Sequence, residues 1–134
     1  MEDIFDKDIT IINRYIDKEH KTQYKISYLK GFWNSNSGIS INGTHLIKDN
    51  EVSAKILIYD SRNPKFQKKE EFKKEQKMWT LQKDDYVIKG IVTEFTTITK
   101  LLENYEDEDV IKIKKIAVKD YGSKEMQHFT ITGG

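Results

Sequence analysis

The sequence predicts a mainly β protein with one short helix, folded as a small antiparallel β-barrel or sandwich of six to seven strands. Three observations lead to this class. Apolar and polar residues alternate with period two in most apolar stretches, as in half-buried strands. Gly, Asn, Asp and Ser separate these stretches at short intervals. Only residues 97–105 show the three- and four-residue apolar spacing of a helix.

Length and composition bound the class of protein. A chain of 134 residues is expected to form a single domain, residues 1–134. Its 23 basic and 22 acidic residues leave a net charge of +1, so nucleic acid is a possible partner that the charge does not favour. No cysteine is present, which excludes disulfides and thiol chemistry and is compatible with a reducing cytosol. The acidic N-terminus and the lack of a long apolar run predict neither a secretory signal nor a membrane partner.

The N-terminal half is expected to supply four strands. The first places Ile9 and Ile11 on one face and Ile12 on the other, and a polar turn at residues 17–22 leads to the second. Residues 43–51 are expected to form a loop that ends in the turn-prone pair Asp49–Asn50. The predicted strands of this half are residues 8–16, 24–33, 39–41 and 52–59.

Residues 65–77, KFQKKEEFKKEQK, differ from the rest of the chain. Six lysines and three glutamates give them a net charge of +3, and Phe66 and Phe72 are the only apolar residues. The spacing of the two phenylalanines forms no helical stripe. We expect a charged, exposed insertion or mobile loop with at most a helical turn, for which non-specific phosphate contact is an alternative to simple solvation.

The chain then returns to the body at residues 78–81 and turns at residues 82–85. A strand is expected at residues 86–92, with Gly90 as a bulge or a point of close backbone approach. Thr97 is a plausible N-cap for the predicted helix, which should cover an open edge or end of the sheet. An acidic loop at residues 106–109 leads to the last hairpin.

Residues 110–134 predict a hairpin that closes the core. Ile111 and Ile113 share one face, whereas Ile116 and Val118 join that face only if a one-residue bulge lies near Lys114–Lys115. The segment from Asp120 to Ser123 has turn chemistry, with Gly122 able to take a positive φ angle. Phe129 and Ile131 then point to the core together.

The sequence offers little positive evidence of catalysis. His20, His45 and His128 are not at metal-ligand spacing, and the acidic run near Asp109 lacks the ligand pattern of a calcium loop. No nucleophile, phosphate-loop or dinucleotide motif is present, so neither an enzyme nor a cofactor is predicted. Four strand aromatics are either core residues or a stacking platform for single-stranded nucleic acid. These are Tyr24, Tyr28, Phe32 and Trp33.

The C-terminal half carries a set of short motifs between Trp79 and Gly134. They are Trp79–Thr80–Leu81, Asp85, Gly90, Asp120–Tyr121–Gly122–Ser123, Met126–Gln127–His128–Phe129 and the terminal glycine pair. Together they resemble a small uncharacterised family encoded by phages and prophages of Gram-positive bacteria, among their capsid and tail genes. The segment Lys30–Trp33 matches more loosely. Asp84 stands where that family usually has glycine.

This resemblance implies a role in virion morphogenesis. The expected protein is a head–tail connector, head-completion or tail-completion subunit that forms a homo-oligomeric ring at the portal and contacts other head and tail proteins. It would be made in the bacterial cytoplasm and located in the virion. The resemblance supplies no active site. The alternative function is a small barrel of a phage or mobile element that binds single-stranded nucleic acid.

Overall fold

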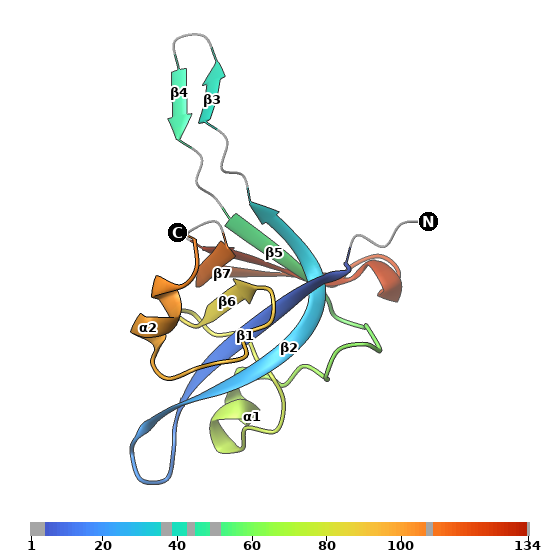
Figure 1. Cartoon of the computed structure of the whole chain (residues 1–134). Coiled ribbons are helices and arrows are strands. Elements are labelled where there is room, and N and C mark those ends of the chain that lie inside the picture. The colour runs from blue at the N-terminus through green and yellow to red at the C-terminus, as the bar shows by residue number, and fades with distance from the viewer. Residues whose placement is uncertain (1–4, 36–38, 43–44, 49–51, 107–108, 134) are drawn as a thin grey trace.

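Six antiparallel strands close into a barrel in the order β1-β2-β5-β8-β7-β6, and β6 pairs back to β1 (Figure 1). The computed structural model describes residues 5–35, 39–42, 45–48, 52–106 and 109–133. The barrel strands are β1 (Lys7–Ile16), β2 (Thr22–Ser35), β5 (Val52–Leu57), β6 (Tyr86–Lys89), β7 (Val110–Lys119) and β8 (His128–Gly133). The mainly β class is confirmed, and the architecture is a barrel, since β1 and β6 join what would be the two edges of an open sheet.

A separate two-stranded sheet lies between β2 and β5 in the chain. It consists of β3 (Ile39–Asn42) and β4 (His45–Lys48), and Figure 1 shows it projecting from the barrel. The expectation of a loop over residues 43–51 is therefore wrong at β4. Leu46 and Ile47 are adjacent, and this short stretch lacks the alternation by which a strand is recognised. Asp49–Asn50 lies outside the described residues.

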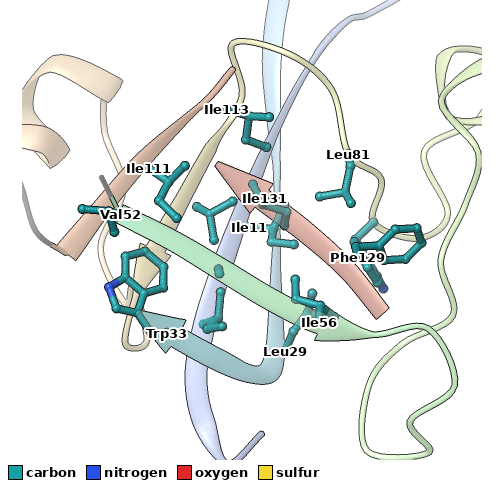
Figure 2. Packing of buried hydrophobic residues seen from close by; sticks show 14 residues of the cluster. Ile11, Leu29, Trp33, Val52, Ile56, Leu81, Ile111, Ile113, Phe129 and Ile131 are labelled. Atoms are coloured by element: carbon teal, nitrogen blue, oxygen red, sulfur yellow. The ribbon is translucent and has the colours of Figure 1, made fainter. Parts of the chain in front are cut away.

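The barrel interior is filled by side chains that alternate along each strand, as Figure 2 shows for residues from several walls. Ile9 and Ile11 are fully buried, and so are Ala54 and Ile56 of β5. This alternation matches the predicted core faces of the first and fourth strands. The buried residues of this cluster are Ile9, Ile11, Leu29, Trp33, Val52, Ala54, Ile56, Trp79, Leu81, Val87, Ile111, Ile113, Phe129 and Ile131.

A second apolar cluster lies on the outside of the barrel wall. Ile12 points away from Ile9 and Ile11 and packs with Ile88, Val92 and Leu101. Leu101 belongs to α2 (Ile98–Glu103), whose N-cap hydroxyl at Thr97 accepts a hydrogen bond from the Lys100 amide at 3.2 Å. The predicted helix is confirmed, but it covers the outer wall, because a closed barrel has no open edge there. Among the described residues no helix is long and apolar enough to cross a membrane.

The final hairpin follows the predicted pattern with one exception. The β7–β8 register shifts between Ile113 and Lys115, which is the expected bulge. Ile116 then pairs with Ile131 and packs against the core. Val118 pairs with buried Phe129 and so shares its face, but it lies at the barrel end and is 53% exposed.

Residues 65–77 contain α1 (Lys69–Lys74) and are attached to the barrel by their two phenylalanines. Phe72 is fully buried and meets Tyr15 edge-on, with 6.1 Å between ring centroids. Phe66 packs against the interior cluster. Most of the lysines and glutamates are exposed, as expected. The two rings therefore attach this charged segment to the barrel. The spacing of the two phenylalanines in the sequence did not indicate that attachment.

Candidate functional site

A network of polar side chains, most of them buried, joins β1 to the turn before β6. We call Asn13, Thr80, Gln82 and Asp85 the polar cluster. The Asn13 amide donates to the Thr80 carbonyl at 2.8 Å and to the Asp85 carboxylate at 2.9 Å, and its oxygen accepts from the Thr80 amide at 3.1 Å. Asn13 and Thr80 are fully buried and Asp85 is 4% exposed. The polar cluster thus joins two chain segments, β1 and residues 80–85, inside the protein.

The polar cluster also continues the β1 ladder beyond the end of β6. Tyr86 pairs with Ile12, so the next backbone groups of β1 on the side of β6 belong to Arg14. The Arg14 amide donates to the Asp85 carboxylate at 3.2 Å, and the Arg14 carbonyl accepts from the Gln82 side chain at 3.1 Å. Gln82 also donates to Asp85 at 2.7 Å. Side chains therefore bind backbone groups of β1 that have no strand partner beyond the end of β6.

Burial raises the pKa of the Asp85 carboxyl, and the hydrogen bonds from Asn13, Gln82 and Arg14 oppose this rise. A buried carboxyl with a raised pKa is a common feature of catalytic acids. Here, however, its two oxygens accept three hydrogen bonds from the protein itself. The Thr80 hydroxyl oxygen is buried without a hydrogen-bond partner. The arrangement supports a structural role for Asp85.

Two of the motif residues, Trp79 and Phe129, pack with Phe66, and we call these three residues the aromatic cluster. Phe66 lies 5.0 Å from Trp79 and 4.7 Å from Phe129, measured between ring centroids. Trp79 meets Phe129 edge-on at 6.0 Å, and its indole N–H donates to the Pro64 carbonyl at 2.7 Å. Trp79 and Phe129 belong to two different short motifs that are distant in sequence. The fold brings these motifs together through this ring contact.

The turn between β7 and β8 carries the exposed part of the motif. Tyr121 is 72% exposed and Met126 is 67% exposed, the highest values among the large apolar side chains in the described part of the chain. Gly122 has a φ angle of 83°, as predicted, and its carbonyl accepts from the Gln127 side chain at 3.1 Å. Ser123 precedes a single 3-10 turn, η2 (Lys124–Met126). The turn is thus ordered by its own contacts while two apolar side chains face solvent.

Two further contacts attach the end of this turn to the barrel. The Gln127 carbonyl accepts from the Ile58 amide at 3.0 Å, and Ile58 directly follows β5. A ring nitrogen of His128, the first residue of β8, lies 2.9 Å from the Met126 carbonyl. The turn is therefore held against the ends of two barrel strands.

Gly90 follows β6 and is not a point of close approach. A side chain built there would meet nothing within 4 Å, so the expectation of close backbone approach is wrong. Its φ angle of 102° gives the physical reason for glycine, since other residues rarely adopt this conformation. The Gly90 amide donates to the Asp8 carbonyl at 2.7 Å, and its carbonyl accepts from the Thr10 hydroxyl at 2.7 Å.

The four strand aromatics do not form one platform. Trp33 is buried in the barrel interior, on the face opposite to the other three. Tyr24 packs against Phe95 outside the wall, with 5.4 Å between ring centroids. Tyr28 is 49% exposed, and its hydroxyl donates to the Val92 carbonyl at 2.7 Å. The stacking platform considered from the sequence is therefore wrong as a group of four.

The histidines lie apart in the fold. His20 is in the β1–β2 turn with a φ angle of 64°, His45 begins β4 and His128 begins β8. Among the described residues no three His, Cys, Asp or Glu side chains are grouped as metal ligands. Part of the acidic loop, residues 107–108, lies outside the described residues.

Comparison with protein families gives one result. The model of a family of unknown function, DUF6751, matches residues 4–134. The chain belongs to the DUF6751 family. The match includes β1, which carries Asn13, as well as the motif-bearing C-terminal half of this DUF6751 chain. The searches of curated proteins and of solved structures found no match.

The structure brings some motif residues of this DUF6751 chain together and separates others. Thr80 and Asp85 meet in the polar cluster, and Trp79 and Phe129 meet in the aromatic cluster. Leu81 lies in the barrel interior, whereas Tyr121 and Met126 remain at the surface. Sequence reasoning missed Asn13 and Gln82. The only local signal was a polar Asn13 within an apolar strand, because its partners are 67 and 72 residues away.

Proposed function

We propose that this protein is a virion-morphogenesis subunit of a phage or prophage, which assembles as a homo-oligomeric ring at the head–tail joint. It would serve as a connector, head-completion or tail-completion protein, acting through contacts between surfaces without bond chemistry. Its place of action would be the virion, after synthesis in the bacterial cytoplasm. The proposal combines the motif resemblance with the position of the motif in the fold.

The exposed turn between β7 and β8 is the observation that carries the proposal. Packing within the fold does not account for the apolar side chains of Tyr121 and Met126, because both face solvent. Tyr59 and Val118 lie at the same end of the barrel and are 56% and 53% exposed. Large apolar side chains gathered at one end are typical of protein contacts. We propose that the partner at this surface is another copy of this chain, since a net charge of +1 imposes little repulsion between copies.

The decisive experiment locates the protein. Particles from an induced host carrying the gene are purified and analysed by mass spectrometry, and the protein is expected among their components. Its absence from particles that contain the other head and tail proteins would overturn the proposal.

A matched pair of variants tests the surface. Tyr121→Ser combined with Met126→Ser should reduce ring formation, measured by native mass spectrometry, and reduce incorporation into particles. Ile16→Ser removes a 58% exposed apolar side chain at the far tip of β1 and should leave both unchanged. Equal assembly by both variants would show that the β7–β8 turn is not the contact.

A further inference from the structure

A line of lysines occupies the outer face of neighbouring barrel strands. Ile111, Ile113 and Ile116 of β7 point into the barrel, so the residues that alternate with them point outward. On β7 these outward residues include four lysines. They are Lys112, Lys114, Lys115 and Lys119.

The pairing of β7, β8 and β5 extends this surface across the sheet. Lys119 pairs with His128, and Ala117 pairs with Thr130, which in turn pairs with Lys55 of β5. Directly paired residues share a face, so Lys55 lies on the same side as the β7 lysines. The Lys55 ammonium lies 5.9 Å from the centre of the Phe32 ring. We call the outward residues of β5, β7 and β8 the basic face.

The basic face contains no negative charge of its own. β5, β7 and β8 include five lysines and no aspartate or glutamate. None of these five lysines forms an ion pair within the described part of the chain. With 23 basic and 22 acidic residues in the whole chain, the remainder is net negative. The net charge of +1 thus hides a strong separation of charge.

The chemistry of this face fits phosphate groups. Its other outward residues include small hydroxyl side chains, Ser53, Thr130 and Thr132, which are common phosphate donors. It lacks the exposed Trp, Tyr and Arg anchors that dominate protein interfaces, where lysine is depleted. It also lacks the series of aromatic side chains on which single strands stack.

The dimensions also fit a duplex. From Lys112 to Lys119 a strand extends about 20 Å at the usual rise per residue. Double-stranded DNA carries roughly twelve phosphate charges over such a length. We propose that the basic face binds double-stranded DNA through its phosphate backbone, without sequence preference. This inference does not rest on the proposed function, since it concerns a different surface.

The test uses the full chain and a fluorescently labelled duplex of arbitrary sequence. Fluorescence anisotropy is measured over a range of salt concentrations. We expect micromolar binding at low salt and a dissociation constant that rises steeply with salt. A quadruple variant, in which Lys112, Lys114, Lys115 and Lys119 are changed to Gln, should bind the duplex at least about tenfold more weakly. Its slope of log affinity against log salt should be shallower by about 3.

The matched control removes the same number of positive charges from the segment of residues 65–77, which contains α1. In this quadruple variant, Lys68, Lys69, Lys73 and Lys74 are changed to Gln; all four are exposed and lie outside the basic face. Its dissociation constant for the duplex should be within about threefold of that of the unmodified chain. Equal losses in the two variants would overturn the proposal. Thermal melts establish that each variant is folded. If the β7 variant is not, Lys115→Glu is compared with Lys69→Glu.

Other polyanions separate the remaining explanations. Stronger binding to a single-stranded oligonucleotide than to the duplex would overturn the proposal. Equal binding to polyglutamate, a stand-in for an acidic protein, would do the same, and so would equal binding to vesicles containing anionic lipid. Failure of the protein to enter particles would leave these measurements unaffected, so the two proposals fail separately.

Discussion

At the scale of single residues, Asp85 shows how a buried carboxylate can serve the fold. Its three hydrogen bonds come from neutral groups of Asn13, Gln82 and the Arg14 backbone. The Asn13 amide cannot simply rotate, because its oxygen already accepts from the Thr80 amide. The orientation of the polar cluster is therefore set by backbone groups on two chain segments.

Asp85→Asn should destabilise the protein by about 1–3 kcal/mol. The new amide would place its NH2 group where a carboxylate oxygen now accepts, so donor would face donor and buried N–H groups would be unsatisfied. Urea denaturation measures the change. Asp84→Asn is the matched control, since Asp84 is exposed and has a φ angle of 72°, which asparagine tolerates. A control variant as unstable as Asp85→Asn would contradict this role.

The pH dependence of stability should carry the signature of Asp85. Burial raises its pKa above the ordinary value of 3.8, so the folded chain keeps this proton to a higher pH than the unfolded chain. The free energy of unfolding therefore falls, through this group, as pH rises from 3.8 to the raised pKa. Asp60 acts in the opposite sense, because the side-chain hydrogen bond from Arg62 lowers its pKa.

Comparison with Asp85→Asn isolates this group. The difference in unfolding free energy, unmodified chain minus variant, should increase as pH falls through the window above 3.8. Denaturation curves collected from acidic to neutral pH measure it. A difference that decreases on acidification would show that the pKa of Asp85 is lowered in the folded state.

At the scale of elements, β8 is the strand on which the C-terminal half depends. It pairs with β5 on one side and β7 on the other, so removing it opens the barrel. Phe129 is 5% exposed and contacts both other rings of the aromatic cluster. The end of the chain is therefore part of the core.

Phe129→Ala should destabilise the protein by about 3–5 kcal/mol, because it leaves a cavity beside Trp79 and Phe66. Truncation before His128 should leave the chain largely unfolded, whereas removal of Gly133–Gly134 should spare folding. Thermal melts compare these variants. Val118→Ala is a control, since Val118 pairs with Phe129 but is 53% exposed. A Phe129→Ala protein that melts within a few degrees of the unmodified chain would make β8 peripheral.

At the scale of the whole molecule, barrel closure separates the six-stranded body from the β3–β4 sheet. Ser35 at the end of β2 pairs directly with Val52 at the start of β5. The connection between them can therefore be shortened to a tight two-residue turn without changing the barrel pairing. The β3–β4 sheet has its own register and, within the described residues, forms no ladder with a barrel strand.

Replacement of residues 36–51 by Asn-Gly should leave the barrel folded. Asn-Gly favours the turn type that suits a two-residue hairpin. Circular dichroism and a thermal melt should show retained barrel strand content and a midpoint within a few degrees of the unmodified chain. Loss of the cooperative transition would show that this segment is needed to close the barrel.

Much of the fold could be predicted because it depends on local spacing. Alternation identified β1, β5 and β8 and their core faces, and the apolar repeat with Thr97 identified α2. The bulge at Ile113–Lys115 followed from the need to keep Ile116 on the core face. β4 was missed because its two apolar residues, Leu46 and Ile47, are adjacent and show no alternation.

The sequence by itself determined the mainly β class, most strand positions and the turn at Gly122, because each follows from the chemistry of neighbouring residues. Only the tertiary structure decided that the strands form a barrel, that Asn13 meets Asp85 across 72 residues and that Phe72 is buried against Tyr15. It also placed Lys55 on the same face as the lysines of β7. These features depend on which distant strands pair, and pairing is selected by the free energy of closing the whole core, which no local pattern records.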